Sequence, residues 1–403
     1  MARSAVGNTK LNTSQYLVGA TGFFSLFSLI GIMFYGLPFF YDFWVKDFGW
    51  SRATVTSGTA VGRITMACFA FLAGWLTDRY GPRKLIITGI LLGGLGLILM
   101  GTMTSLFQFY LFNLIAAAGY IAGGPLPNQV LMSRWFHNSR GKAMGVAYLG
   151  VGIGGMLVPQ IAKALNLHFD WQQSITVLGI LMIVIALPFV WFVKDKPSHL
   201  LIEEQNQQQP ATLKKILRTK EFYLLAIGSV CSIGAVSGTS QHLKLFFSLD
   251  LHLSQATAAN MITLVLFSSI LGRLFMGWLA DRIPKKYVMV IIYILVATSI
   301  PLLYFASVPG VLYLFAFIFG MGLGGDYMII PLMAAELFGV RIMGRVMGIV
   351  LSADVAADAL APVVVGRLRD IGGDYANAFA VLIILAVIGI IAVLMLPKKS
   401  VEL

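Results

Sequence analysis

Long apolar stretches, each able to cross a lipid bilayer, restrict the fold of this sequence more than any other feature. Stretches of about 20 apolar residues recur from end to end of the 403-residue chain, and a helix of about 20 residues spans the hydrocarbon core. The chain is 58% hydrophobic and only 11% charged. Soluble domains carry about 25% charged residues, so we expect this chain to lie in a membrane.

The apolar stretches fall into two sets of six. We expect helices, because the hydrocarbon core holds no water to hydrogen-bond an open strand edge and the stretches lack the alternation of barrel strands. The predicted fold class is therefore an all-α integral membrane protein with twelve transmembrane helices in two six-helix halves. The predicted spans are residues 16–41, 53–77, 85–105, 107–132, 143–166, 173–193, 221–247, 256–280, 287–307, 310–335, 344–368 and 374–396.

The positive charge of the chain is explained by topology rather than by nucleic-acid binding. The formal net charge is +12, and most of the 29 Lys and Arg residues fall in loops on one side of the predicted spans. Because basic loops stay in the cytoplasm, we expect a multi-pass protein of the inner membrane with both termini cytoplasmic. The outer loops hold few basic residues, namely Lys46, Arg52, Lys163, Lys244, Arg367 and Arg369.

No sequence pattern indicates an enzyme, a cofactor or a metal site. Cys68 and Cys231 both lie in apolar stretches, which suits neither a disulfide framework nor a metal site. The chain has no phosphate-binding loop ending in GKS or GKT, no HExxH and no serine nucleophile elbow. Residues 1–15 lack the pattern of a removable signal peptide. We therefore expect no catalytic residues, no cofactor and a monomer.

An internal repeat relates the two halves. GWLTDRYGPRK at 74–84 has a counterpart in GWLADRIPKK at 277–286, and GKAMGV at 141–146 has a counterpart in GRVMGI at 344–349. Both pairs are 203 residues apart, as a duplication would produce, and paired halves are common in secondary transporters. The predicted domains are an N-terminal half at 1–194, a cytoplasmic linker at 195–220 and a C-terminal half at 221–403.

Several motifs resemble those of the major facilitator superfamily. The loop after the second predicted helix resembles that superfamily's motif at Gly74, Leu76, Asp78, Arg79, Gly81, Arg83 and Lys84. The C-terminal half is similar to the branch of monocarboxylate transporters and the oxalate:formate antiporter. That similarity rests on Arg273 before Gly277, on GGDYMIIPLMAAELFG at 324–339 and on APVVVGRLRD at 361–370. DFGWSRA at 47–53, before the second predicted helix, is similar to the same branch.

The resemblance implies that the motif acid Asp78 contacts a neighbouring helix terminus and stabilises one gate. Such a contact is physically favourable, because a carboxylate gains hydrogen bonds and dipole stabilisation at helix N-terminal amides. The alternative is that these charges merely set topology at the membrane surface. The predicted gating residues are Asp78, Arg79, Arg83, Asp281 and Arg282.

Arg273 is the strongest candidate for a substrate-binding residue. It precedes Asp281 by eight residues, which places it about 12 Å deep in a core about 30 Å thick. A guanidinium at that depth normally faces a cavity and has a partner, and its planar fork suits a carboxylate. In the resembled branch this arginine binds the substrate carboxylate. The alternative is an internal ion pair that locks helices together.

Arg63 is the second arginine within a predicted span. It lies about 22 Å along the helix from Asp78, toward the outer half. It could contact a second anion, form an outer-gate ion pair or extend its charge to the interface. Cavity-facing polar groups could come from Tyr35, Asn113, Tyr120 and Tyr327, although the glycines beside the last two are more typical of helix packing.

Three deep carboxylates are candidates for proton coupling. Asp326 lies in the tenth span, and Asp354 and Asp358 lie one turn apart in the eleventh, where we expect them to share a helix face. Like charges and desolvation both favour a bound proton in such a group. We favour Asp354, then Asp326. The alternative is that the acids simply neutralise Arg63 and Arg273.

The sequence departs from the resembled branch at two positions. Proton-coupled monocarboxylate transporters usually carry an acid one turn before the helix-eight arginine, where this chain has Ser269. The oxalate:formate antiporter has a lysine where this chain has Asp354. One arginine without that lysine fits a monoanion better than oxalate, although Arg63 could restore a second positive group.

These features together predict a secondary active transporter that moves a small lactate- or pyruvate-like monocarboxylate by alternating access with proton symport. Its partners would be the carboxylate, the proton and the lipid bilayer. One alternative is an exchanger of dicarboxylates or other organic anions that uses both Arg63 and Arg273. Another is a membrane receptor without transport, which would have no need of ionisable groups at the midplane.

Overall fold

The computed structural model describes residues 12–197 and 213–397, and within these ranges all regular structure is helical. Twelve helical segments in the described part are long and apolar enough to cross a membrane, and they coincide with the twelve spans expected from the sequence. The predicted fold class of a multi-pass, all-α membrane protein is therefore confirmed.

The N-terminal six spans are built from eight α-helices. The first span begins as α1, continues through a π-helical stretch at Phe27–Gly36 and a 3₁₀ turn at Leu37–Phe40, and ends as α2. The bounds are α1 Thr13–Leu26, α2 Tyr41–Phe48, α3 Arg52–Tyr80, α4 Pro82–Met100, α5 Leu106–Gly123, α6 Pro125–Trp135, α7 Arg140–Asn166 and α8 Trp171–Phe192.

The C-terminal six spans follow a short helix, α10, at Leu213–Ile216. The seventh span ends in a π-helical stretch at Phe246–Asp250, and the ninth ends in a 3₁₀ turn at Ile300–Phe305. The bounds are α11 Lys220–Leu245, α12 Gln255–Ala280, α13 Lys285–Ser299, α14 Val311–Phe338, α15 Met343–Gly372 and α16 Ala376–Leu394. Most of the predicted linker at 195–220 lies outside the described residues.

The fourth span is interrupted at Pro125. α5 ends at Gly123 and α6 begins at Pro125, because proline lacks the N–H that would continue the helical hydrogen bonds. The Asn128 side-chain amide donates to the carbonyls of Gly123 and Gly124, each at 2.8 Å. These bonds satisfy backbone groups that a break inside a membrane would otherwise leave unpaired.

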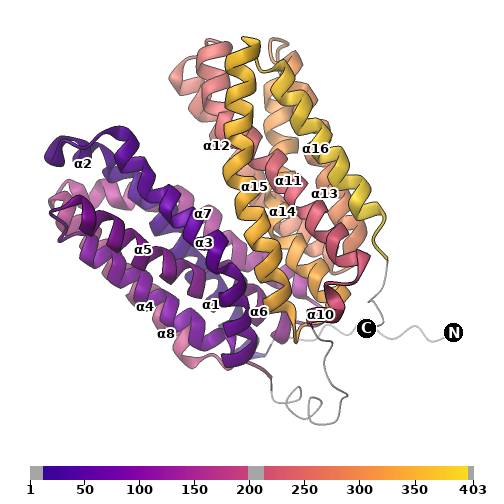
Figure 1. The fold of residues 1–403 in the computed structure, drawn as a ribbon, viewed down its shortest axis with the longest axis horizontal. Helices are drawn as coiled ribbons and strands as arrows, with labels where there is room; N and C mark the ends of the chain where they lie inside the picture. Colours follow the sequence, from indigo (N-terminus) through magenta and orange to yellow (C-terminus); the bar gives the residue numbers. More distant parts are fainter. Residues whose placement is uncertain (1–11, 198–212, 398–403) are drawn as a thin grey trace.

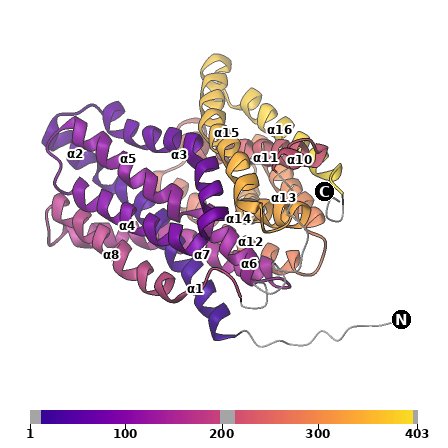
Figure 2. The ribbon, with the colours of Figure 1, turned by 60° about the horizontal axis from the view of Figure 1, so that its bottom comes forward.

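The two halves form two helical bundles that meet at one end of the molecule and diverge toward the other (Figure 1). We call the end at which α3 and α12 finish and α7 and α15 begin the base. Figure 2 shows the two bundles side by side, and the main contacts between them are α3 with α15 and α7 with α12. Each pair joins one helix of each half, and the two pairs occupy equivalent positions in the repeat.

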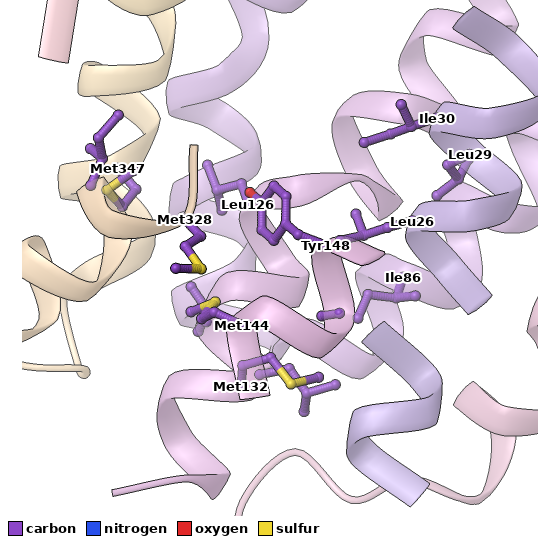
Figure 3. Close-up of a cluster of buried hydrophobic side chains, with 14 of the residues drawn as sticks. Leu26, Leu29, Ile30, Ile86, Leu126, Met132, Met144, Tyr148, Met328 and Met347 are labelled. Atoms are coloured by element: carbon purple, nitrogen blue, oxygen red, sulfur yellow. The ribbon is translucent and has the colours of Figure 1, made fainter. Parts of the chain in front are cut away.

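An apolar core continues from one half into the other near the base (Figure 3). Methionines from four helices are fully or almost fully buried in it, and their unbranched side chains fill irregular gaps between helices. This packing removes the space that a polar solute would need to pass between the halves at the base. The methionines are Met132 of α6, Met144 of α7, Met328 of α14 and Met347 of α15.

Replacing Asn128 with Leu should destabilise the protein, because two buried carbonyls at the helix break would lose their donor. The expected cost is about 2 kcal/mol, seen as a lower midpoint of thermal unfolding in detergent. The control is Asn113→Leu, which removes one bond to the carbonyl of Phe109 in its own helix and should have a smaller effect. Equal midpoints for Asn128→Leu and the wild type would contradict the assigned role of Asn128.

Candidate functional site

Asp78 joins the end of α3 to the start of α15 at the base. Its Oδ1 accepts a hydrogen bond from the Gly344 amide at 2.9 Å, and its Oδ2 accepts from the Arg345 amide at 3.0 Å. The Arg345 side chain adds a charged contact to Oδ2 at 3.2 Å. A carboxylate at this position satisfies the free N–H groups of the helix start and interacts favourably with its dipole. The N-terminal half is thereby tied to the C-terminal half.

Asp281 makes the same contact in the opposite direction. It follows the end of α12 and accepts hydrogen bonds from the amides of Gly141 at 2.7 Å and Lys142 at 2.9 Å, at the start of α7. Burial raises the pKa of Asp281 although both amides act against that shift. This carboxyl therefore takes up a proton at a higher pH than an exposed aspartate. The base is held closed by two equivalent contacts, one from each half of the repeat.

Glycines make these two contacts geometrically possible. A Cβ atom at Gly74 would collide with the carbonyl oxygen of Gly344, and one at Gly141 would collide with the carbonyl oxygen of Gly277. The helices of each pair therefore cross with their backbones almost touching, as small residues allow in membrane proteins. This close crossing brings each aspartate within reach of the opposite helix start.

The basic residues of the motif lie against their own half. Arg79 stacks on Trp75, with the guanidinium 5.0 Å from the ring centroid, and Arg282 stacks on Trp278 at 3.7 Å. The backbone amide of Arg83 donates to Asp195 at 2.8 Å, and its side chain donates to the carbonyl of Trp191. For these three arginines the described structure gives no contact between halves, so the gating proposal rests on Asp78 and Asp281.

Arg273 is buried where α12 of the C-terminal half packs on α7 of the N-terminal half. Its side chain is 8% exposed, and its Nη1 donates to the hydroxyl of Ser269 at 3.0 Å. Among the described residues no carboxylate forms an ion pair with it. Gly152 of α7 faces it, and a Cβ there would approach Nη1 to 2.9 Å. The internal ion pair that the sequence left open for Arg273 is therefore absent from the described structure.

Three tyrosines lie within electrostatic range of the Arg273 charge. Tyr35, Tyr148 and Tyr327 are the groups that interact with it electrostatically. Tyr35 comes from the π-helical stretch of the first span, a kind of distortion often found at functional sites, and Tyr327 comes from α14. Tyr35 and Tyr327 are exposed, whereas Tyr148 is buried and its hydroxyl accepts a hydrogen bond from Gln129 at 2.5 Å. Both halves thus contribute to the surroundings of Arg273.

Tyr148 was not anticipated from the sequence. A signal was present, because Tyr148 lies three residues after Gly145 and four before Gly152 on one face of α7. A Cβ at Gly145 would crowd the Arg273 backbone carbonyl, and Gly152 faces its side chain. The glycine spacing therefore marks the helix face that packs on α12, and Tyr148 shares that face.

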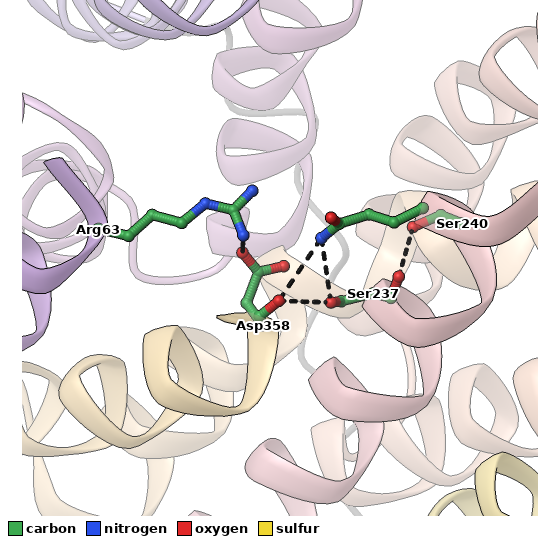
Figure 4. A network of polar contacts seen from close by, with 5 residues as sticks. Arg63, Ser237, Ser240 and Asp358 are labelled. Carbon is green, nitrogen blue, oxygen red and sulfur yellow. Dashed lines mark hydrogen bonds and ion pairs between the residues drawn. The ribbon is translucent and has the colours of Figure 1, made fainter. Parts of the chain in front are cut away.

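Arg63 and Asp358 form an ion pair between the halves. Nη1 of Arg63 on α3 lies 3.1 Å from Oδ2 of Asp358 on α15 (Figure 4). The two side chains are 31% and 27% exposed, so water can reach the ion pair. The sequence left three roles open for Arg63, and the structure shows it in an ion pair between the halves.

Asp326 and Asp354 lie within the C-terminal half, and neither forms an ion pair with another described residue. Asp354 is 5% exposed, and the Ser229 hydroxyl lies 2.7 and 2.8 Å from its two oxygens. Asp326 is 0% exposed and accepts from Ser232 at 3.0 Å, while its Oδ2 has no hydrogen-bond partner among the described residues. Among the described residues, serine hydroxyls are therefore the groups that hydrogen-bond these two buried carboxyls.

Asp354 and Asp358, one turn apart on α15, have different partners. Asp354 faces Ser229 of α11 inside the C-terminal half, whereas Asp358 reaches Arg63 in the other half. One helical turn corresponds to 3.6 residues, so a four-residue spacing rotates the second side chain, and α15 passes between two different neighbours. Spaced serines on α11, including Ser229 and Ser232, were the unused sequence signal for the internal site.

Asn113 and Tyr120, both predicted to contact substrate, differ in placement. The Asn113 amide donates to the carbonyl of Phe109 in its own helix at 2.8 Å and lies against α3, so it is not brought to Arg273. The Tyr120 ring packs on Phe34 at 5.0 Å, and its hydroxyl interacts electrostatically with Tyr35 and with the ion pair. Tyr120 therefore belongs to the polar cluster between the halves.

Comparison with known proteins places the chain in a family. A family model described as Major Facilitator Superfamily matches residues 22–259 and 243–402, which together cover nearly the whole chain. The chain belongs to the major facilitator superfamily, and it is a multi-pass secondary transporter rather than an enzyme.

Its relatives carry different functions. Monocarboxylate transporter 13 of Bos taurus is 24% identical over 372 residues, covering 91% of this chain and 85% of that protein. Membrane sensor protein UhpC of Escherichia coli K12 is 25% identical over 371 residues, covering 86% and 84%. The solved structure of the fucose:proton symporter FucP of E. coli superposes with a TM-score of 0.72 at 16% identity, covering 94% and 97%.

Replacing Asp78 with Asn should loosen the base, because the start of α15 would lose a charged acceptor. Hydrogen bonds to charged groups contribute about 1.5–3 kcal/mol, so the Gly344 and Arg345 amides should exchange with deuterium about tenfold faster or more. Exchange mass spectrometry of peptides covering 341–347 measures this. Asp281→Asn is the matched variant and should act on the Gly141 and Lys142 amides instead. Unchanged exchange in both variants would contradict the proposed lock.

Proposed function

We propose that this transporter moves a small lactate- or pyruvate-like monocarboxylate, bound through Arg273, together with a proton. The observation that carries the proposal is a buried guanidinium whose described hydrogen bond goes to the hydroxyl of Ser269 rather than to a carboxylate. Arginine stays charged in proteins, so this cation needs an anion from outside the protein to balance it. A substrate carboxylate would supply that charge and match the planar fork of donors.

The identity of residue 269 supports this assignment. An acid one turn before Arg273 would form an ion pair with the guanidinium, and its negative charge would balance the positive charge in the absence of substrate. Ser269 donates its own proton to the Leu266 carbonyl at 2.7 Å and leaves an oxygen that accepts from Arg273. The serine thus orients the guanidinium without neutralising it. Hydroxyls of Tyr35 and Tyr327 could hydrogen-bond the 2-hydroxyl or 2-keto oxygen of such a substrate.

Alternating access would proceed by exchange of the contacts at the base. With the base closed by Asp78, Asp281 and the methionine core, substrate would reach Arg273 from the side on which the halves diverge. Release on the other side would require both helix-start contacts to break, as rocking of two repeat-related halves allows. From the distribution of basic loops we propose that the base is the cytoplasmic side, with both termini cytoplasmic, in an inner-membrane monomer.

Asp354 and Asp326 are the proposed proton carriers. An ionised carboxylate buried among hydroxyls and apolar groups is costly, and a bound proton removes that cost. Asp354 lies on α15, the helix whose start forms one of the base contacts, so its surroundings would change when the halves rock. Proton binding and the state of the base would then be linked, which is what symport requires.

A role in sensing an external anion in addition to transport is the second candidate, because a protein named membrane sensor protein UhpC is among the relatives. Flux of a labelled substrate measures transport directly, whereas sensing would also require an anion-dependent signal to a partner protein. The buried acids favour transport, because recognition of an anion by a receptor does not require a protonatable site.

Arg273→Gln should abolish proton-driven uptake of labelled lactate into proteoliposomes, because the substrate would lose its charge partner. Arg273→Lys should retain only part of the uptake, since lysine keeps the charge but lacks the fork. The control is Lys163→Gln, which removes an exposed positive charge from α7 and should leave uptake unchanged. Undiminished uptake by Arg273→Gln would end the assignment of this residue.

Asp354→Asn should retain exchange of lactate across the membrane but lose its accumulation under an inward proton gradient. The asparagine mimics a permanently protonated acid, so the carrier can still cycle with substrate bound but cannot release the proton. Asp370→Asn, which changes a largely exposed acid on the same helix, is the matched control. Equal loss in the exchange and gradient-driven modes would argue against coupling through Asp354, and Asp326→Asn tests the other acid in the same way.

A further inference from the structure

We propose that Asp358 restricts the transporter to monoanions by occupying the second guanidinium of the interior, Arg63, as a built-in replacement for a second substrate carboxylate. This inference rests on the proposed function, because it takes Arg273 as the group that binds the first carboxylate. It assigns Asp358 and Arg63 as residues that determine specificity, distinct from the proton-coupling acids.

The pair lies in the same polar cluster as Arg273. Arg273 and Tyr35 lie against neighbouring glycines of α7, namely Gly152 and Gly155, and Tyr120 packs on Phe34 beside Tyr35. The charge of Asp358 acts on both tyrosines, and the charge of Arg63 acts on Tyr120. Counted along the helices from the two crossings at the base, Arg273 lies about 6 Å and Arg63 about 16 Å from it. Arg273 and Arg63 thus differ in depth by about 10 Å, which a four-carbon dicarboxylate held between two long arginine side chains could span.

A small anion could approach the ion pair. The side chains of Arg63 and Asp358 are about one-third exposed, whereas Arg273 is nearly buried. The pair is a single contact of 3.1 Å between one guanidinium nitrogen and one carboxylate oxygen, so the rest of the Arg63 fork remains available. A fork that engages one oxygen has the donors to hold a second carboxylate if Asp358 is removed.

The backbone of α15 holds Asp358 in place. Pro362 lies four residues further on and has no N–H, so the Asp358 carbonyl lacks its helical donor. The Ser237 hydroxyl of α11 donates to that carbonyl at 2.9 Å, and Gln241 adds a long contact at 3.5 Å (Figure 4). The acid is therefore anchored to the C-terminal half at the position where it meets Arg63, rather than being a freely moving surface side chain.

The charge balance of the cluster then selects the substrate. With Arg63 neutralised by Asp358, Arg273 is the remaining uncompensated cation of this cluster in the described structure. One carboxylate completes the balance. A dianion would bring its second carboxylate toward Asp358 and be repelled, so specificity would arise from a fixed repulsive charge as well as from an attractive one.

The test compares lactate and succinate as competitors and as labelled substrates in proteoliposomes. Asp358→Asn should free Arg63 and raise the apparent affinity for succinate about tenfold or more relative to lactate. The double variant Arg63→Gln with Asp358→Asn should lose this gain in succinate affinity, and Asp358→Glu should keep the wild-type preference for lactate over succinate. Asp370→Asn controls for removal of an exposed acid from the same helix.

A second measurement needs no variant. Succinate and its monomethyl ester have nearly the same size but carry two charges and one, and the wild type should prefer the ester about tenfold or more. Equal competition by the two compounds, no gain in Asp358→Asn, or a gain that persists without Arg63 would each overturn the inference. Lactate uptake that does not depend on Arg273 would instead overturn the proposed function, and labelled succinate would still report the Arg63-dependent gain separately.

Discussion

The contacts of two aspartates with the starts of helices in the opposite half are the interactions on which the rest of this structure depends. Asp78 and Asp281 each accept two backbone amides across the interface between the halves. These bonds form where glycines let the helices cross almost in backbone contact. Because the base is joined in this way, the bundles diverge only toward the other end (Figure 1).

The interior charges are divided into three arrangements, and the division follows from what neutralises each charge. Arg273 has a serine hydroxyl and tyrosines around it, Arg63 has a carboxylate from the other half, and Asp326 and Asp354 have serines. For these arrangements we propose three different events in a medium of low dielectric constant, namely anion binding, discrimination by charge, and proton binding. The proposed symport and its proposed selectivity use separate groups of residues.

Much of the fold followed from particular sequence patterns, and part of the site did not. The twelve spans were recognisable because hydrocarbon requires long apolar helices, and the repeated motif located the two base aspartates. The partner of Asp358 could not be assigned from α15 alone, because Arg63 is almost 300 residues away in sequence. Tyr148 and the serines of α11 were visible only as spacings, and neither spacing indicates which helix lies opposite.

The sequence by itself determined the membrane-spanning helices, their grouping into repeated halves and the depth of each ionisable residue, because these depend on apolar length, on the repeat interval and on the rise of a helix. The tertiary structure decided which charges are neutralised. Whether the charge of a buried arginine is balanced by a protein carboxylate or is left for an external anion depends on which side chains from distant helices face it. That is set by how the two bundles cross, since the interaction between charges changes steeply with a few ångströms of separation.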